Sequence, residues 1–247
     1  VFALFARRGR DTVAKADRAM NKRSFLKASG TLITGGMLSR LGADQQQGSS
    51  QTNWAGNYRY QRERLDVPET VEEVQRIVKS RSTVKALGTR HSFNGIADST
   101  GDQISLKNLN QMTIDEKART VTVGGGVPYG HLCPYLDEHG YALHNLASLP
   151  HISVAGARST ATHGSGIRNG NLATAVSAIE LVTANGEVVT LSQEKDGERF
   201  RGAVVDLGAL GVVTRVTLAI QPRYEMRQAG YQNLSISELE HHLDAIF

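Results

Sequence analysis

Hydrophobic positions in the middle of this chain follow first a helical and then a strand period. Apolar residues recur at helical spacing from Val71 to Val78, directly after Thr70, whose Thr-Val-Glu-Glu sequence has the form of a capping box. The pattern therefore predicts a helix. The apolar run Val84–Leu87 that follows predicts a buried strand.

Further along, the pattern predicts strand pairs on either side of one helix. The stretch "MTIDEKARTVTVGG" is typical of two strands joined by a polar turn, and "AVSAIELVTANGEVVTL" of two strands around Asn185-Gly186, since both turn residues tolerate positive φ. Between them, "PYGHLCPYLDEHG" predicts a helix with Pro128 at an early position and a stop at Gly140. A last strand, within "GALGVVTRVTLAIQP", is expected to end at Pro222. This mixture indicates an α+β fold, without the regular alternation of a doubly wound sheet.

The first 50 residues differ from the rest. In "NKRSFLKASGTLITGGMLSRLGA" a basic start precedes a weakly apolar stretch that is too short to span a bilayer, the order of an export signal. The Lys22-Arg23 pair resembles a twin-arginine leader with Lys in place of the first Arg, which predicts a periplasmic or extracellular protein without stable membrane insertion. Met20 suggests the true start, with residues 1–19 as upstream read-through. The alternative is a disordered basic tail, and a cytoplasmic protein if residues 20–45 are not a signal.

Composition narrows the function classes. The chain is 40% hydrophobic and 21% charged, and its net charge of +4 comes from basic residues near the start. The sequence has no basic stripe interleaved with aromatic residues, so it gives no indication of nucleic-acid binding. Cys133 is the single cysteine, so no internal disulfide is possible, and no Cys or His spacing predicts a metal site.

Three glycine-rich turns stand out: "GTRHSFNG", "GGGVPYG" and "THGSGIRNG". Each could present backbone N–H groups to phosphate oxygens, although none has the glycine spacing of a Rossmann fingerprint or a P-loop. Taken singly, each is more readily explained as a tight turn. Together, and with a histidine in two of them, they indicate a large phosphate-bearing cofactor.

The stretches "GTRHSFN", "TVTVGGGV", "NLASLPHISVAGARSTATHGSG", "AIELVTANGEVV" and "FRGAVVDLGALGVVTRVTL" resemble, in order and spacing, the FAD-binding domain of the vanillyl-alcohol oxidase superfamily, closest to alditol and aldonolactone oxidases. The resemblance runs from about Thr52 to Met226 and departs from the family at Arg158 and Ala161, where smaller residues or glycine are usual. It implies a two-subdomain FAD-binding fold of the PCMH type over residues 51–225. Residues 1–50 would then be the upstream and signal segment, and residues 226–247 the start of a truncated substrate domain.

The resemblance implies that His91 is bonded covalently to the methyl group on the benzenoid end of the flavin. A neutral imidazole nitrogen is a competent nucleophile, and an electron-poor flavin makes that methyl carbon electrophilic. The alternative is a histidine that is hydrogen-bonded to the turn. Some relatives carry a second, cysteinyl bond at the position of Leu149, so a single tether is expected here.

The other cofactor residues also follow from the resemblance. Backbone donors for the pyrophosphate are expected from Gly88, Thr89, Arg90, Ser92 and Phe93. Relatives line the flavin ring and phosphates at the positions of Ser148, Ser153, Gly156, Thr160, Thr162, His163 and Gly164. Val213 falls on the adenine side, whereas His144 and His151 are interpreted as structural.

The resemblance implies hydride transfer from a carbinol carbon of a polyol or sugar lactone to flavin N5, followed by reoxidation by oxygen to give hydrogen peroxide. Ser148 would lie on the substrate side and Ala147 where a methyl group can control access of oxygen. The substrate-binding acid and base are expected beyond Phe247, so this chain alone should bind FAD weakly and not turn over. Two alternatives remain open: a dehydrogenase that passes electrons to a cytochrome or quinone, and a non-catalytic FAD-binding module.

Overall fold

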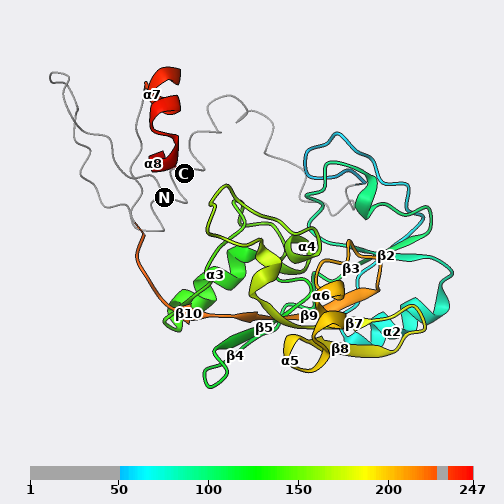
Figure 1. The fold of residues 1–247 in the computed structure, drawn as a ribbon. Coiled ribbons are helices and arrows are strands. Elements are labelled where there is room, and N and C mark those ends of the chain that lie inside the picture. Colours follow the sequence, from blue (N-terminus) through cyan, green and yellow to red (C-terminus); the bar gives the residue numbers. More distant parts are fainter. Residues whose placement is uncertain (1–50, 227–232, 247) are drawn as a thin grey trace. The chain divides into compact units, whose positions relative to one another are not determined.

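The computed structural model describes residues 51–226 and 233–246, and the described residues 51–224 belong to one compact unit (Figure 1). The predicted leader lies outside the described residues. Of the second unit the structure describes the helices α7 (Ile236–His241) and α8 (Leu243–Ile246). That residues 226–247 begin a substrate domain stays a prediction. Among the described residues, no helix has both the length and the apolar character needed to cross a membrane.

A small parallel sheet forms one part of the compact unit. Its strand order is β1 (Leu65–Asp66), β3 (Asp102–Ser105), β2 (Val84–Leu87). Helix α2 (Val71–Ser80) contributes Val74 and Val78 to a core that also contains Ile104 of β3. The carboxyl end of β2 runs into the first glycine-rich turn, and a 3-10 turn, η1 (Gly95–Ala97), follows it. Ligands of open sheets commonly bind at this end of parallel strands.

A five-stranded antiparallel sheet forms the other part. Its order is β4 (Met112–Asp115), β5 (Thr120–Gly124), β9 (Val212–Ala219), β7 (Val176–Val182), β8 (Val188–Ser192). One face packs in a single large core with helices from three places in the chain: α3 (Tyr129–Glu138), α4 (Val154–Ser159) and α6 (Glu198–Ala203). The remaining elements are the pair β6 (Tyr141–Ala142) and β10 (Gln221–Pro222), the 3-10 turn η2 (Leu172–Ala175) and helix α5 (Gln193–Asp196). The predicted α+β class is confirmed (Figure 1).

The start of α2 is as predicted except for one hydrogen bond. The hydroxyl of Thr70 caps the helix by accepting from the N–H of Glu73 at 3.2 Å. In a full capping box the carboxylate of Glu73 would accept from the cap residue itself. Here it accepts from the N–H of Glu69 at 2.7 Å, one residue earlier, so only half of the predicted box forms.

The hairpin and the last strand also differ in detail from expectation. In the β7–β8 turn, only Gly186 has a positive φ, of 77°, whereas Asn185 accepts with its side chain from the N–H of Glu187 at 3.3 Å. The prediction that Asn185 uses a positive φ is therefore wrong, although the turn lies where the sequence predicts it. Strand β9 ends at Ala219 rather than Pro222, because Gln221 and Pro222 pair with β6.

The glycines of "GGGVPYG" are explained by packing. A Cβ added to Gly124, Gly125 or Gly126 would lie 2.0–2.3 Å from a carbonyl oxygen of Leu109, Val213 or Leu106. No side chain fits at such distances. This turn is thus a close contact of backbones, which is one of the standard requirements for glycine.

Arg158, one of the two departures from the family pattern, forms a buried ion pair. Its Nη2 donates to Oδ2 of Asp206 at 3.1 Å, and the two side chains are 2% and 0% exposed. Arg158 Nη1 donates to the carbonyl of Val204 at 3.0 Å, and Asp206 Oδ1 accepts from the hydroxyl of Ser159 at 2.6 Å. The pair therefore ties α4 to the segment after α6.

Ala161, the other departure, adopts a left-handed backbone with φ of 50°. Glycine reaches this region without the steric cost that a Cβ brings, which would explain the glycine that the family resemblance leads us to expect here.

Candidate functional site

The turn after β2 has an unusual backbone. Arg90 lies in the left-handed region with φ of 64°, although it is neither glycine nor asparagine. Within the part of the chain that the structure describes, the backbone N–H groups of Thr89, His91, Ser92 and Phe93 donate no hydrogen bond to another protein group. A run of free N–H groups around a left-handed residue is the arrangement that binds anions in many phosphate sites.

The start of α4 packs directly against this turn. The N–H of Ser153 donates to the hydroxyl of Thr89 at 3.2 Å, and the hydroxyl of Ser153 accepts from the N–H of Gly156 at 3.3 Å. A Cβ added to Gly88 would lie 3.0 Å from that hydroxyl oxygen. Four of the predicted cofactor residues are therefore in mutual contact, and the absence of a side chain at Gly88 permits the approach.

His91 faces a second histidine. Its Nδ1 lies 3.2 Å from Nε2 of His151, so one ring donates to the other. Trp54 covers both rings, with centroid distances of 4.8 Å to His91 and 5.4 Å to His151, and is nearly parallel to the latter. The alternative in which His91 bonds to the turn backbone is not what the structure shows. His151, which the sequence indicates as structural, belongs to the site, and so does Trp54, which no pattern in the sequence places there.

The segment after α4 continues from the same helix. The hydroxyl of Thr160 accepts from or donates to that of Thr162 at 3.2 Å, and the N–H of Thr162 donates to the carbonyl of Ala157 at 3.0 Å. His163 is exposed and donates from Nδ1 to the carbonyl of Gly164 at 3.0 Å. The exposed Gly164 has open space where a Cβ would be. The polar groups of these residues are accessible and lie directly after α4, the helix that packs against the turn.

Three predicted residues are not joined to the turn by any hydrogen bond or ring contact among the described residues. Ala147 packs against the large core, Ser148 is exposed, and Val213 is buried in β9. The side chain of Val213 faces the core. Their predicted roles stay predictions.

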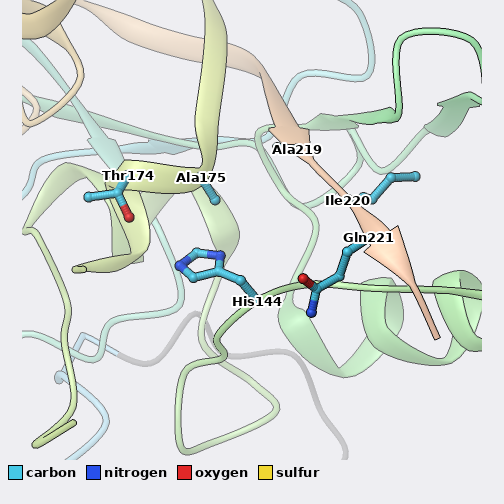
Figure 2. Close-up of a pocket in the computed structure, with 6 residues that line it drawn as sticks. All are labelled: His144, Thr174, Ala175, Ala219, Ile220 and Gln221. Carbon is cyan, nitrogen blue, oxygen red and sulfur yellow. The ribbon is translucent and has the colours of Figure 1, made fainter. Parts of the chain in front are cut away.

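A separate hollow of about 250 Å³ lies at the end of β9, and Figure 2 shows the imidazole of His144 between the side chains of Thr174 and Gln221. Ala175, Ala219 and Ile220 complete its lining. None of the predicted cofactor residues takes part. We therefore assign the candidate site to the turn and α4 rather than to this hollow.

The histidine pair predicts a dependence of stability on pH. Burial, and then the charge of His91, lower the pKa of His151 below its ordinary 6.5. The folded state therefore binds fewer protons than the unfolded state as pH falls through this range. The stability that the neutral ring contributes is complete above about pH 6.5 and is lost below it. We expect the melting temperature of His151→Gln to fall less between pH 7 and pH 5 than that of the wild type. Equal falls in the two proteins would show that this ring does not sense pH.

Comparison with known proteins agrees with this geometry. The family model described as FAD binding domain matches residues 63–192, which is more than half of the chain and contains the turn, α4 and the segment after it. The chain belongs to the FAD binding domain family. The resemblance drawn from the sequence and the FAD-binding fold are thereby confirmed.

The relatives of this chain have names that denote oxidoreductases. It is 45% identical to an alditol oxidase of a Streptomyces species over 194 residues, which cover 76% of this chain and 46% of the relative. It is 34% identical to the L-gulonolactone oxidase of Bos taurus, over 78% of this chain and 45% of that one. With an L-gulono-1,4-lactone dehydrogenase of Mycobacterium tuberculosis it shares 35% identity, over 71% and 40%. The chain spans less than half the length of these relatives.

Solved structures share the fold. A BBE-like protein of Physcomitrella patens and a xylooligosaccharide oxidase of Myceliophthora thermophila each superpose with a TM-score of 0.59, covering 69% of this chain and 38% of theirs. Sequence identity is 23% and 20%, so these similarities concern the fold alone.

The residues present fit FAD. The free N–H groups of the turn are donors suited to a pyrophosphate. The aromatic cluster of Trp54, His91 and His151 borders the same turn and offers flat surfaces to a ring system.

Proposed function

We propose that this chain holds FAD covalently through His91 and is the cofactor-binding part of an oxidoreductase that acts on an alcohol group of a polyol or sugar lactone. The observation that carries the proposal is the turn itself, whose free N–H groups lie beside a histidine held at its Nδ1 by His151. Family membership supplies the cofactor, and the turn supplies the donors that a pyrophosphate requires.

Residues of the turn would bind the cofactor phosphates, and other residues would orient the groups that meet the flavin. The N–H groups of Thr89, His91, Ser92 and Phe93 would bind the phosphates, and Ser153 would fix the turn through Thr89. His151 would orient the ring of His91 and accept or supply the proton that the two rings share. When bound, the flavin supplies a two-electron acceptor, which the proposed oxidation of a carbinol requires.

The names of the relatives support the substrate class and leave two acceptors to compare. Alditol and lactone oxidases favour oxygen as the acceptor with formation of hydrogen peroxide, whereas the mycobacterial relative is a dehydrogenase. We propose oxygen, with Ala147 beside its path and Ser148 on the substrate side. Because the chain covers less than half of the relatives, we expect turnover only when the residues corresponding to their remaining length are present.

An assay of a form of the protein that includes residues corresponding to the remaining length of the relatives separates these acceptors. With xylitol, sorbitol or L-gulonolactone, an oxidase consumes oxygen and forms peroxide. A dehydrogenase instead reduces an added quinone or cytochrome and leaves oxygen untouched. FAD binding with neither reaction on any of these substrates would favour the non-catalytic module.

The FAD site itself can be tested in the 247-residue chain by Gly88→Ala. The new Cβ would lie 3.0 Å from the hydroxyl of Ser153, which is tighter than ordinary contact, so the hydroxyl or the turn must give by a few tenths of an ångström. We expect the dissociation constant for FAD, measured with apoprotein before any tether forms, to rise by about tenfold, which corresponds to about 1.4 kcal/mol.

Gly202→Ala is the matched control, because Gly202 has no atom within 4 Å of an added Cβ. Wild-type affinity in Gly88→Ala would contradict the placement of the site at this turn.

A further inference from the structure

A short segment upstream of the first sheet runs along the cofactor turn. It comprises residues 52–57, "TNWAGN", and we name it the strap. Its groups hydrogen-bond to three carbonyls of the turn: the N–H of Trp54 donates to Arg90 at 2.7 Å, Asn53 Nδ2 to Ser92 at 2.8 Å and Asn57 Nδ2 to Phe93 at 3.0 Å. In return, Nη1 of Arg90 donates to the carbonyl of Thr52 at 3.2 Å.

The strap is itself held in one shape by Asn53, which is 3% exposed. Besides its bond to the turn, Asn53 Nδ2 donates to Oδ1 of Asn57 at 2.7 Å, and its Oδ1 accepts from the N–H of Tyr58 at 3.1 Å. The N–H of Gly56 donates to the carbonyl of Asn53 at 3.1 Å. A buried amide with its donors and acceptor used specifies a single arrangement.

Peptide geometry connects these carbonyl bonds to the free N–H groups on the turn. In a trans peptide the C=O of one residue and the N–H of the next lie in one plane and point in opposite directions. The carbonyls of Arg90 and Ser92 share their peptide planes with the N–H groups of His91 and Phe93. Because the strap binds these two carbonyls, the two N–H groups are directed away from the strap, where they find no protein acceptor among the described residues.

Trp54 adds a second contact with the site. It is 53% exposed, so its position is not explained by burial in a core. Its ring instead lies against His91 and His151, at 4.8 and 5.4 Å between centroids. The ring thereby restricts the rotation of the histidine that we propose as the tether.

We propose that the strap is a positioning element for FAD: it holds the turn by its carbonyls so that the N–H groups face the pyrophosphate, and it holds the ring of His91 in the orientation that the flavin meets. This inference rests on the proposed function of the turn. It assigns positioning roles to Asn53 and Trp54. A strap that only completed the fold would affect stability and leave FAD binding and attachment unchanged.

The experiment compares Trp54→Ala and Asn53→Asp with the wild type, each as the 247-residue apoprotein mixed with FAD. Asn53→Asp keeps the acceptor and removes both donors but adds a negative charge, so Asn53→Ser, which removes the amide donors without a charge, is measured beside it and should weaken FAD binding to a similar extent. Trp54→Ala changes an exposed side chain, so it should fold normally. Three quantities are measured: the dissociation constant for FAD, the rate at which flavin becomes acid-stable at saturating FAD, and the melting temperature without FAD. Val188→Ala, at an exposed apolar position of β8, is the control.

We expect Asn53→Asp to raise the dissociation constant for FAD about tenfold, because the hydrogen bond that holds the carbonyl of Ser92 is lost. We expect Trp54→Ala to slow attachment about a hundredfold, the usual effect of a misplacement of about 1 Å. Trp54→Phe, which keeps a flat ring, should restore most of the rate. Melting of Trp54→Ala and Val188→Ala should match the wild type.

The possible outcomes distinguish failure of the strap proposal from failure of the proposed function. If the wild type attaches FAD and both variants bind and attach it at wild-type levels, the strap has no positioning role and the proposed function stands. If the wild-type flavin is bound but never acid-stable, the tether is wrong, and weaker binding by Asn53→Asp still supports the strap. A wild type that binds no FAD overturns both.

Discussion

Replacing His91 with alanine is expected to change the bound flavin from fully acid-stable to fully acid-releasable. The proposed covalent bond has one donor in the chain, and Leu149 stands where the family resemblance would place a second, cysteinyl bond. Precipitation with acid should therefore leave the wild-type pellet yellow and the His91→Ala pellet colourless. The variant should still bind FAD before denaturation, because the N–H groups of the turn belong to the backbone and are kept.

His131→Ala, a histidine on α3 with no part in the site, serves as the control and should retain its flavin. Flavin that stays in the His91→Ala pellet would place the bond on another residue. Flavin that leaves the wild-type pellet would show that there is no bond.

Replacing Asp206 with alanine is expected to lower the free energy of unfolding by about 3–5 kcal/mol, the usual effect of leaving one buried charge without its partner. Arg158 is 2% exposed and meets solvent no better in the variant, and burial already lowers its pKa despite the carboxylate. The variant also removes the acceptor for Ser159 and for the N–H of Gly208. Urea unfolding of the apoprotein measures the change.

Two comparisons make this prediction specific to the buried pair. Glu198→Ala breaks an exposed ion pair with Arg201 and should cost less than about 1 kcal/mol. The double variant Arg158→Met with Asp206→Asn removes both charges and keeps an acceptor for Ser159, so it should recover much of the loss. If Asp206→Ala costs no more than Glu198→Ala, the pair does not hold α4 in place.

Local patterns in the sequence were sufficient for much of the fold. The cap at Thr70, the strand Val84–Leu87 and the turn at Gly186 each depend on residues within a few positions of one another, and each is found where the pattern indicates. Strand β3 and helix α4 were not predicted. β3 has four residues and is fixed by its two parallel neighbours, and α4 has six residues inside a glycine-rich stretch. Their pairing and packing partners decide their structure.

In the site, too, local patterns predict some residues, whereas contacts between distant segments determine the others. A family pattern surrounds His91 and indicates its role, whereas the sequence around His151 indicates only a structural histidine. Nothing near His151 in the sequence shows that its ring lies 3.2 Å from one that is 60 positions away. The ring contact of Trp54 likewise depends on the strap crossing the turn. In the sequence, a single tryptophan precedes a glycine turn in "TNWAGN". This pattern indicates an aromatic side chain in a fixed position, but it does not show which residues the ring contacts.

The direct measurement is a peptide map of the wild-type protein after incubation with FAD and proteolysis under acid conditions. Formation of the bond would remove one hydrogen from the imidazole of His91 and one from the flavin methyl group, and the two electrons would pass through the flavin ring to oxygen. We therefore expect the peptide containing His91 to carry the mass of FAD less two hydrogens, and fragmentation to place this mass on His91. The peptide containing His151 should be unmodified. An unmodified His91 peptide together with free FAD, or FAD attached at another residue, would contradict the account.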